Sequence, residues 1–245
     1  VGNIPITSVQ NNAILPVPYF VAENYSFEDS LLIEVKSPLK NRMNFIVSIN
    51  GKTQKYDGPF WLKETSIIKA TIVNEGDKES LPAIGTFKKR DKNMTIIDLS
   101  NYANQYSGGG NQALVDGIDG GFDYRTGFWQ GVQGNDYFIT IDRGRERPIS
   151  QVKIGCFQDI KSWIWFPKEI EIYTSNDNEN FTLSSTITND FSREVFGNFK
   201  RDFEASLKGN ARYIKINAIY PGDCPQWHLG AGGKAWIFMD EITID

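Results

Sequence analysis

The feature that most limits the fold of this chain is its hydrophobic pattern, in which short runs of branched and aromatic residues recur without any long helical periodicity. In the first half, Asn-Gly, Asp-Gly and Glu-Gly pairs at Asn50, Asp57 and Glu75 separate these runs. Such pairs favour tight turns between antiparallel strands. Runs recurring every ~8–12 residues predict a small β-sandwich, with strands at Leu31–Val35, Asn44–Ile49, Ile67–Val73 and Ala83–Phe87.

The second half of the chain repeats the strand pattern with longer loops. A polar stretch, Lys88–Asn93, precedes it, and polar linkers are where domain boundaries usually fall. We therefore predict one domain at residues 1–90 and another at residues 91–245. The second domain is expected to be an antiparallel sandwich of jelly-roll type, so the predicted fold class is all-β. Its predicted strands are Met94–Leu99, Tyr137–Ile141, Ile149–Cys156, Glu169–Thr174, Phe181–Ile187, Arg212–Ala218 and Trp236–Ile244.

Charge and composition exclude several classes of partner. The formal net charge is −4 over 245 residues, and lysine and arginine are scattered, so we expect no binding to nucleic acid. No apolar run approaches the ~20 residues of a membrane span, so we expect a soluble chain without membrane insertion. Cys156 and Cys224 lack metal-site spacing, which leaves a single disulfide and two buried thiols both open.

Tryptophan is concentrated in the second half, where the segments Asp123–Gly131 and Trp227–Trp236 set indole rings beside glycines and polar side chains. Such segments suit a shallow pocket for a ring-shaped polar ligand better than a packed core. Loops on a rigid sandwich are also where binding residues are usually displayed. Trp61, between two apolar neighbours in the first domain, is instead expected in a core.

No constellation in the sequence predicts catalysis. A glycosidase needs two carboxyl groups ~5–10 Å apart across a cleft, and the loop acids here are better interpreted as solvated side chains with one metal site. His228 is the only histidine, and no Gly-x-Ser-x-Gly elbow precedes it, so it is expected either to contact a ligand or to pack within its loop. The loop acids are Asp116, Asp119, Asp123, Asp159, Asp223 and Asp240.

Six motifs follow one another through the second domain: Asp116–Gly117, Arg125–Trp129, Ile139–Gly144, Pro167–Ser175, Ala211–Ile216 and Asp240–Ile242. Together they resemble the factor V/VIII type C or discoidin domain, the group that contains the family 32 carbohydrate-binding modules. The segments Trp129–Gly131 and Trp227–Trp236 are further similar to discoidin domains appended to bacterial β-N-acetylhexosaminidases of glycoside hydrolase family 20.

The first domain carries a second resemblance. Leu15–Phe20, Phe27–Val35, Tyr56–Phe60 and Ile67–Ala70 are similar to the small immunoglobulin-like, fibronectin-III-associated domain of chitobiases, although Ile49–Lys52 replaces its usual aspartate-containing turn. The tandem implies the C-terminal region of a glycosidase that is secreted, periplasmic or on the cell surface. A catalytic barrel would require ~250 further residues, so this chain is not expected to be an enzyme itself.

Oxygen-bearing residues of the second domain suit calcium. Asp116 opens a turn, Thr126 offers a hydroxyl and a carbonyl, and Glu241 lies near the last strand, which are the hard ligands that Ca²⁺ prefers. The resemblance to discoidin modules implies a structural calcium held by these residues and by carbonyls around Ala113 and Asp119. A salt-bridged acid pair without metal is the alternative.

The expected ligand is a glycan. The C–H faces of a sugar pack on indole rings and its hydroxyls pair with polar heads, which predicts a binding set of Arg125, Gln130, Asp159, Trp163, Trp227, His228 and Lys234. The resemblance implies a terminal galactose- or N-acetylhexosamine-type sugar and targeting of a catalytic glycosidase domain in the same parent chain.

Two other roles compete with sugar binding. The loop indoles could pack against a neighbouring domain, which would make the chain a structural spacer with no ligand of its own. Discoidin domains that adhere to phospholipid display apolar side chains on their loop tips, whereas the aromatics here come with glycines and polar heads.

Overall fold

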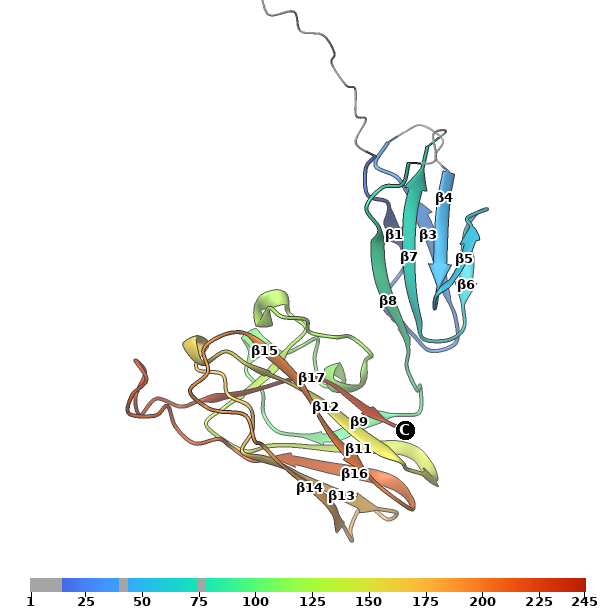
Figure 1. Cartoon of the computed structure of the whole chain (residues 1–245). Coiled ribbons are helices and arrows are strands. Elements are labelled where there is room, and N and C mark those ends of the chain that lie inside the picture. The colour runs from blue at the N-terminus through green and yellow to red at the C-terminus, as the bar shows by residue number, and fades with distance from the viewer. Residues whose placement is uncertain (1–14, 40–43, 75–77) are drawn as a thin grey trace, which may run out of the picture. The chain divides into compact units, whose positions relative to one another are not determined.

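The computed structural model describes residues 15–39, 44–74 and 78–245. The chain divides into two compact units, Val1–Lys89 and Arg90–Asp245, and the division falls inside the polar stretch Lys88–Asn93 (Figure 1). Among the described residues, regular structure consists of strands and four short 3₁₀ turns. The predicted all-β fold is therefore confirmed. No helix in this part of the chain is long and apolar enough to cross a bilayer.

The first unit is a small sandwich of two sheets, ordered β1-β3-β6 and β2-β8-β7-β4-β5. The predicted strands are confirmed as β3, β4, β7 and β8. In β3 and in the first half of β7, buried residues alternate with more exposed ones, so that one face packs against the other sheet. The Asn50–Gly51 pair turns β4 into β5 with positive φ at both residues. The strands are β1 (Tyr19–Val21), β2 (Ser26–Phe27), β3 (Leu31–Lys36), β4 (Asn44–Ile49), β5 (Lys52–Lys55), β6 (Phe60–Leu62), β7 (Ser66–Val73) and β8 (Ala83–Lys89).

One prediction for the first unit is wrong, and another concerns residues that the structure does not describe. Trp61 was expected in the core, but it lies on β6 with 62% of its surface exposed, because its neighbours Phe60 and Leu62 face the other way. The turn expected at Glu75 lies outside the described residues.

The second unit packs a five-stranded sheet, β14-β13-β16-β11-β9, against a four-stranded sheet, β10-β17-β12-β15. All neighbouring strands within both sheets are antiparallel. The seven predicted strands are present, and β10 and β15 are additional. The strands are β9 (Thr95–Leu99), β10 (Gln130–Gln133), β11 (Tyr137–Pro148), β12 (Gln151–Gln158), β13 (Glu169–Ser175), β14 (Thr182–Thr188), β15 (Phe199–Ser206), β16 (Asn210–Ala218) and β17 (Trp236–Ile244).

The core between these sheets consists of branched side chains that alternate along each strand. Ile139 and Ile141 on β11 face Ile154 on β12 and Met239 on β17, and all are fully buried. Full burial of each such side chain contributes about 1.5–3 kcal/mol, which holds the two sheets in one arrangement. Cys156 and Cys224 are buried free thiols in this structure.

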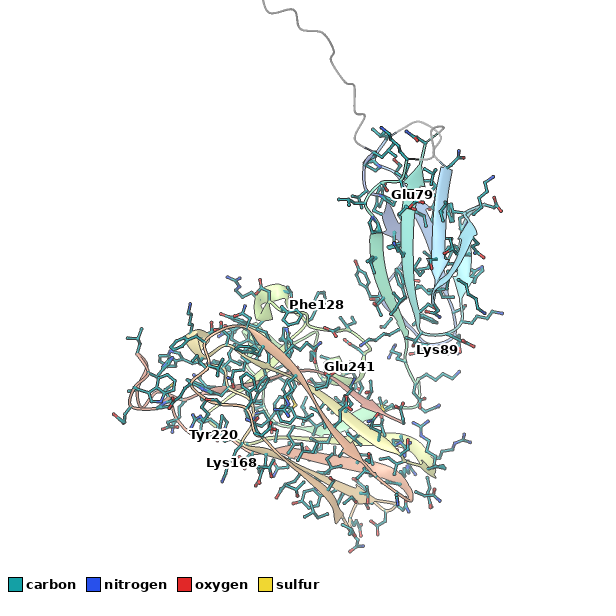
Figure 2. All side chains as sticks on the ribbon, viewed as in Figure 1. Glu79, Lys89, Phe128, Lys168, Tyr220 and Glu241 are labelled. Atoms are coloured by element: carbon teal, nitrogen blue, oxygen red, sulfur yellow. The ribbon has the colours of Figure 1, made fainter. Side chains whose placement is uncertain are left out.

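Strand register brings several loops to one end of the second unit. Gln158 pairs with Phe199, and Phe157 pairs with Phe238. The loops that follow β12 and precede β15 and β17 therefore start from the same edge of the sandwich. The loop that follows β16 joins them, because it leads into β17. Figure 2 labels Lys168 and Tyr220 at this end, and the Lys168 N–H donates to the carbonyl next to Tyr220, that of Ile219, at 2.9 Å.

The opposite end of the sandwich is closed by a buried arginine. Strand β11 bulges between Asp142 and Arg147, where Gly144 takes a positive φ of 78°. The Arg143 guanidinium is 2% exposed and donates to the carbonyls of Arg147, Ala211 and Pro148 at 2.9–3.1 Å. The bonds to Arg147 and Pro148 hold the two sides of the bulge together, and the bond to Ala211 ties it to β16.

Replacing Arg143 should destabilise the second unit selectively. We expect Arg143→Met to lower the free energy of unfolding by about 2–4 kcal/mol, because the buried carbonyl of Ala211 and the partly buried carbonyls of Arg147 and Pro148 lose their donor. Arg145→Met, at an exposed position of the same bulge, should change it by less than about 0.5 kcal/mol. Urea unfolding followed by tryptophan fluorescence measures both, and equal losses would contradict the role assigned to Arg143.

Candidate ligand-binding site

Three loops enclose a hollow at the loop end of the second unit. Its volume is about 470 Å³. One loop connects β12 to β13, another connects β14 to β15, and the third connects β16 to β17. The lining is mostly apolar and aromatic, as is usual for small-molecule sites. The lining residues are Lys161, Trp163, Phe196, Trp227, His228, Leu229 and Gly230.

Trp163 is positioned by a short turn at the end of β12. The carboxylate of Asp159 accepts a hydrogen bond from the Lys161 N–H at 3.2 Å and from the Ser162 hydroxyl at 2.6 Å, which starts the 3₁₀ turn Ile160–Ser162. The turn ends with Trp163 in the left-handed region at φ 64°. This conformation is strained for a bulky residue and is often associated with functional sites. Asp159 is therefore a buried positioning residue for Trp163.

The glycine-rich loop provides the surface on which the Trp163 indole packs. A Cβ atom at Gly230 would lie 2.8 Å from Nε1 of Trp163 and closer still to Cε2, and one at Gly233 would lie 2.6 Å from Cζ3. Only glycine allows the backbone to approach the ring this closely. These glycines thus form one wall against which the indole is held.

His228 holds the glycine-rich loop in place through hydrogen bonds made by both of its ring nitrogens. Its Nδ1 accepts the Gly230 N–H at 3.0 Å, so its Nε2 carries the proton and donates to the carbonyl of Ile160 at 2.7 Å. The ring is 8% exposed and meets Trp165 edge-on. Of the two roles expected for His228, loop packing is the one observed, because both ring nitrogens are used within the protein.

The rim of the hollow is apolar and exposed. Trp227 is 45% exposed and meets Phe196 edge-on at 6.4 Å between ring centroids. Phe196 is 59% exposed and Leu229 is fully exposed. The loop tips therefore carry more apolar surface than the sequence pattern indicated.

The remaining predicted ligand residues lie elsewhere. Gln130 is a correction, because its amide is fully buried and donates to the carbonyls of Ser107 and Gly110 while it accepts the Tyr137 hydroxyl. Arg125 and Lys234 are exposed, but neither lines the hollow. The predicted set of seven is thus reduced to Trp163, Trp227 and His228 in the lining.

Arg125 and Lys234 are held by neighbouring carboxylates. The Arg125 guanidinium bonds both oxygens of Asp123, which lowers the pKa of that carboxyl and raises the pKa of Arg125. The Lys234 ammonium bonds both oxygens of Asp223 at 3.0 Å and so lowers the pKa of Asp223.

Tyr220 completes the group formed by Lys234 and Asp223. Its hydroxyl donates to Asp223 at 2.9 Å and accepts the Ala235 N–H. Burial, with the hydrogen bond to Asp223, raises the pKa of Tyr220 to about 12. These contacts fix the ends of the β16–β17 loop, so this group has a structural role.

Sequence reasoning missed four lining residues, namely Lys161, Phe196, Leu229 and Gly230. Phe196 had a detectable signal, because it follows Val195 and precedes Gly197 in a loop that is mostly polar. An exposed apolar pair beside a glycine often marks a contact surface.

The predicted calcium ligands lie in a separate region, where an acidic bulge holds a loop. Asp240 and Glu241 on β17 both stand opposite Gly155 on β12, which makes a β-bulge. Asp240 accepts the Gly120 N–H at 2.8 Å, and Glu241 accepts the Gly117 N–H at 2.9 Å. The loop that contains Asp116 is thereby attached to β17.

A lysine supplies positive charge within this region. The Lys200 ammonium pairs with Asp240 at 2.6 Å and also pairs with Asp119. Burial raises the pKa of Asp240 while Lys200 opposes that shift, and the attraction of Asp240 and Asp119 outweighs burial and raises the pKa of Lys200. The other Asp240 oxygen, Oδ1, is buried without a hydrogen-bond partner.

The donor set fits calcium in part. Asp116 and Glu241 belong to the attached loop and its bulge, whereas the Asp119 side chain is paired with Lys200 and the Thr126 hydroxyl donates to the carbonyl of Asp123 at 2.9 Å. Ala113 is buried in the turn Ala113–Val115, where only its carbonyl could serve. Within the described residues, no three His, Cys, Asp or Glu side chains are grouped for a metal. Backbone carbonyls would have to complete the coordination.

The second unit is thus a β-sandwich with a hollow between three loops at one end. The F5/8 type C domain family matches residues 97–234, more than half of the sequence, and the chain belongs to this family. The family is non-catalytic. No curated protein matches the chain.

Solved structures with low identity also align with it. A family 32 module, CBM32-3, from a family 31 glycoside hydrolase of Clostridium perfringens is 16% identical, with a TM-score of 0.41, over 62% of this chain and 90% of that one. The C-terminal domain of a Bacteroides fragilis chitobiase is 16% identical, with a TM-score of 0.41, over 63% and 93%. The family 32 module of C. perfringens NanJ, solved with galactose, is 17% identical, with a TM-score of 0.40, over 62% and 93%.

Adding a methyl group at Gly230 should dislodge the Trp163 indole. We expect Gly230→Ala to lower the free energy of unfolding by about 1–3 kcal/mol and to shift tryptophan emission to longer wavelength. The added methyl group would displace the indole from the Gly230 backbone and expose it to water. Ala231→Ser, at an exposed neighbouring position, is the matched control. Unchanged emission in Gly230→Ala would contradict the packing described here.

Proposed function

We propose that this chain is a non-catalytic carbohydrate-binding module and that the hollow between the three loops is its sugar site. The observation that carries the proposal is the pair of indoles in the lining, Trp163 and Trp227, on a domain of the F5/8 type C family. Aromatic rings at the rim of a shallow hollow suit the C–H face of a pyranose ring.

The preorganised geometry of Trp163 supports this proposal. Its ring is held by Gly230 and Gly233 before any ligand arrives, so little side-chain entropy is lost on binding. Trp227 is half exposed and can add a second face. A single sugar still offers few apolar atoms, so a Kd of about 0.1–1 mM or weaker is expected.

The preferred sugar and the biological role form the finer part of the proposal. We infer a terminal galactose- or N-acetylhexosamine-type residue and a secreted, periplasmic or cell-surface parent glycosidase of the β-N-acetylhexosaminidase type. A weak module tethered to such an enzyme would raise the local concentration of its substrate. The first unit would then be the immunoglobulin-like domain that precedes the module.

A spacer role is the alternative, and one observation favours it. Phe196, Trp227 and Leu229 form an exposed apolar rim, which would also suit contact with another domain of the parent protein. Sugar affinity separates the two roles, because a spacer has none.

Removing the exposed indole of the hollow should abolish most sugar binding. We expect Trp227→Ala to weaken affinity for the best of galactose, N-acetylgalactosamine and N-acetylglucosamine about five- to tenfold, because one stacking face is lost. Trp61→Ala removes an exposed indole from the first unit and should leave affinity unchanged. Chemical-shift titration measures both, and no binding of any sugar up to tens of millimolar would leave the spacer role.

We also propose a structural calcium bound by the side chains of Asp116 and Glu241 and by carbonyl oxygens of Ala113, Asp119 and Thr126. The attachment of the Asp116 loop to Glu241 supports it. Calcium would rigidify this loop, and it has no role in contacting the sugar.

Calcium should therefore raise the melting temperature of the second unit. At calcium a hundredfold above its Kd, the stabilisation is about 2.7 kcal/mol, or about 5–11 °C for a domain of this size. Glu241→Gln should remove the response, whereas Asp119→Asn should keep it because the carbonyl is retained. Scanning calorimetry with calcium and then EDTA decides, and identical melting curves would contradict a calcium site.

A further inference from the structure

The polar groups that line the hollow favour one kind of sugar over another. We propose that the hollow prefers an anionic sugar, one that carries a carboxylate or a sulfate ester, over its neutral counterpart. This inference rests on the proposed function, because it concerns the same site.

The side chains that line the hollow offer hydrogen-bond donors and no free acceptor. The Trp163 and Trp227 indole N–H groups and the Lys161 ammonium have no hydrogen bond or ion pair within the described part of the chain. The one side-chain acceptor in the lining is Nδ1 of His228, which is used by the Gly230 N–H. Phe196 and Leu229 contribute only carbon.

Two carboxylates close in sequence to the lining, those of Asp159 and Asp223, are already engaged, and Glu194, two residues before Phe196, does not line the hollow. Asp159 is 8% exposed, accepts the Lys161 N–H and the Ser162 hydroxyl, and interacts electrostatically with Arg125. Asp223 on the β16–β17 loop is neutralised by Lys234. Lys161 is therefore the charged side chain that the hollow presents to a ligand, and its charge is positive.

Donor-only chemistry discriminates between sugars. A neutral sugar hydroxyl both donates and accepts hydrogen bonds. In this hollow no side chain can accept the bond that the hydroxyl donates, so the hydroxyl must donate it to water. Carboxylate and sulfate oxygens only accept, and hydrogen bonds from a cation to an anion are about twice as strong as neutral ones. The apolar rim of Phe196, Trp227 and Leu229 lowers the local dielectric, which strengthens the attraction to Lys161.

Matched ligand pairs test this preference on the whole chain. Methyl galactoside is titrated beside methyl galacturonide and beside galactose 6-sulfate, with chemical shifts of the indole N–H groups as the readout. We expect one of the anionic sugars to bind about tenfold more tightly than galactoside at low salt, with the advantage shrinking as salt rises. The tighter of the two identifies carboxylate or sulfate as the recognised group.

Lysine variants locate the charge that is responsible. Lys161→Met should weaken binding of the anionic sugar about tenfold and so remove its advantage over the neutral sugar. Lys168→Met is the matched control, because Lys168 is an exposed lysine of the same β12–β13 loop outside the hollow, and it should keep the tenfold preference. The melting temperature of each variant confirms folding.

Failure of this inference and failure of the proposed function give different results. Equal affinity for neutral and anionic sugars, or a preference that survives Lys161→Met, would overturn the anionic preference and leave sugar binding in place. The absence of binding by every sugar, with no shift of either indole, would overturn the proposed function together with the inference.

Discussion

The packing of two antiparallel sheets in the second unit is the constraint on which the candidate site depends. Its core of isoleucine side chains determines the register of β12 with β15 and β17, and that register sets where each strand ends. The three loops around the hollow begin within a residue or two of those ends. A shift of one residue in any of these strands would turn its buried face outward, so the core enforces the position of the loops indirectly.

Within the candidate site, glycines determine the shape of one wall, and ion pairs balance most of the charged side chains around the hollow. Gly230 and Gly233 let the Trp163 indole lie directly against the backbone of the glycine-rich loop. Most nearby charges are then cancelled locally, Arg125 by Asp123 and Lys234 by Asp223. Surface ion pairs of this kind contribute little stability, but they leave Lys161 as the uncompensated charge in the hollow.

The sequence predicted strands well and contacts between loops poorly. Strands such as Leu31–Lys36 and Glu169–Ser175 are recognisable because alternation of side chains is a local property of one strand. Trp61 was wrongly expected in the core because three consecutive apolar residues hide the period of two, so the exposed one cannot be identified. Gln130 was wrongly expected at the ligand because the sequence does not show that Ser107, Gly110 and Tyr137 surround its amide.

The hollow itself could be predicted only in part. Trp227 precedes a glycine-rich stretch and Trp163 lies in a loop between two predicted strands, which are local signals, but Phe196 reaches them from a third loop that is more than thirty residues from either. The meeting of three loops follows from sheet register, which a single sequence specifies only through the completed core.

The acidic bulge of β17 places two neighbouring carboxylates, those of Asp240 and Glu241, where both can bind the same loop. Successive residues of a strand normally point to opposite faces, yet Asp240 and Glu241 both attach the loop around Gly117 and Gly120, because the bulge sets both opposite Gly155. A Cβ atom at position 155 would collide with the Asp240 carboxylate, so the glycine is a requirement of the bulge.

The Lys200 ammonium balances the negative charge of the buried Asp240 carboxylate. Because of this pairing, Asp240 is not available to bind a cation, whereas Glu241 accepts the Gly117 N–H. Asp240 is committed to Lys200 and to the backbone, and Asp119 is drawn to the same ammonium. Breaking such a buried pair is costly, because one charge would remain without a partner. A cation bound in this loop must therefore rely on Glu241, Asp116 and carbonyl oxygens, and its effect would be felt by the loop rather than by the hollow, where Lys161 alone provides charge.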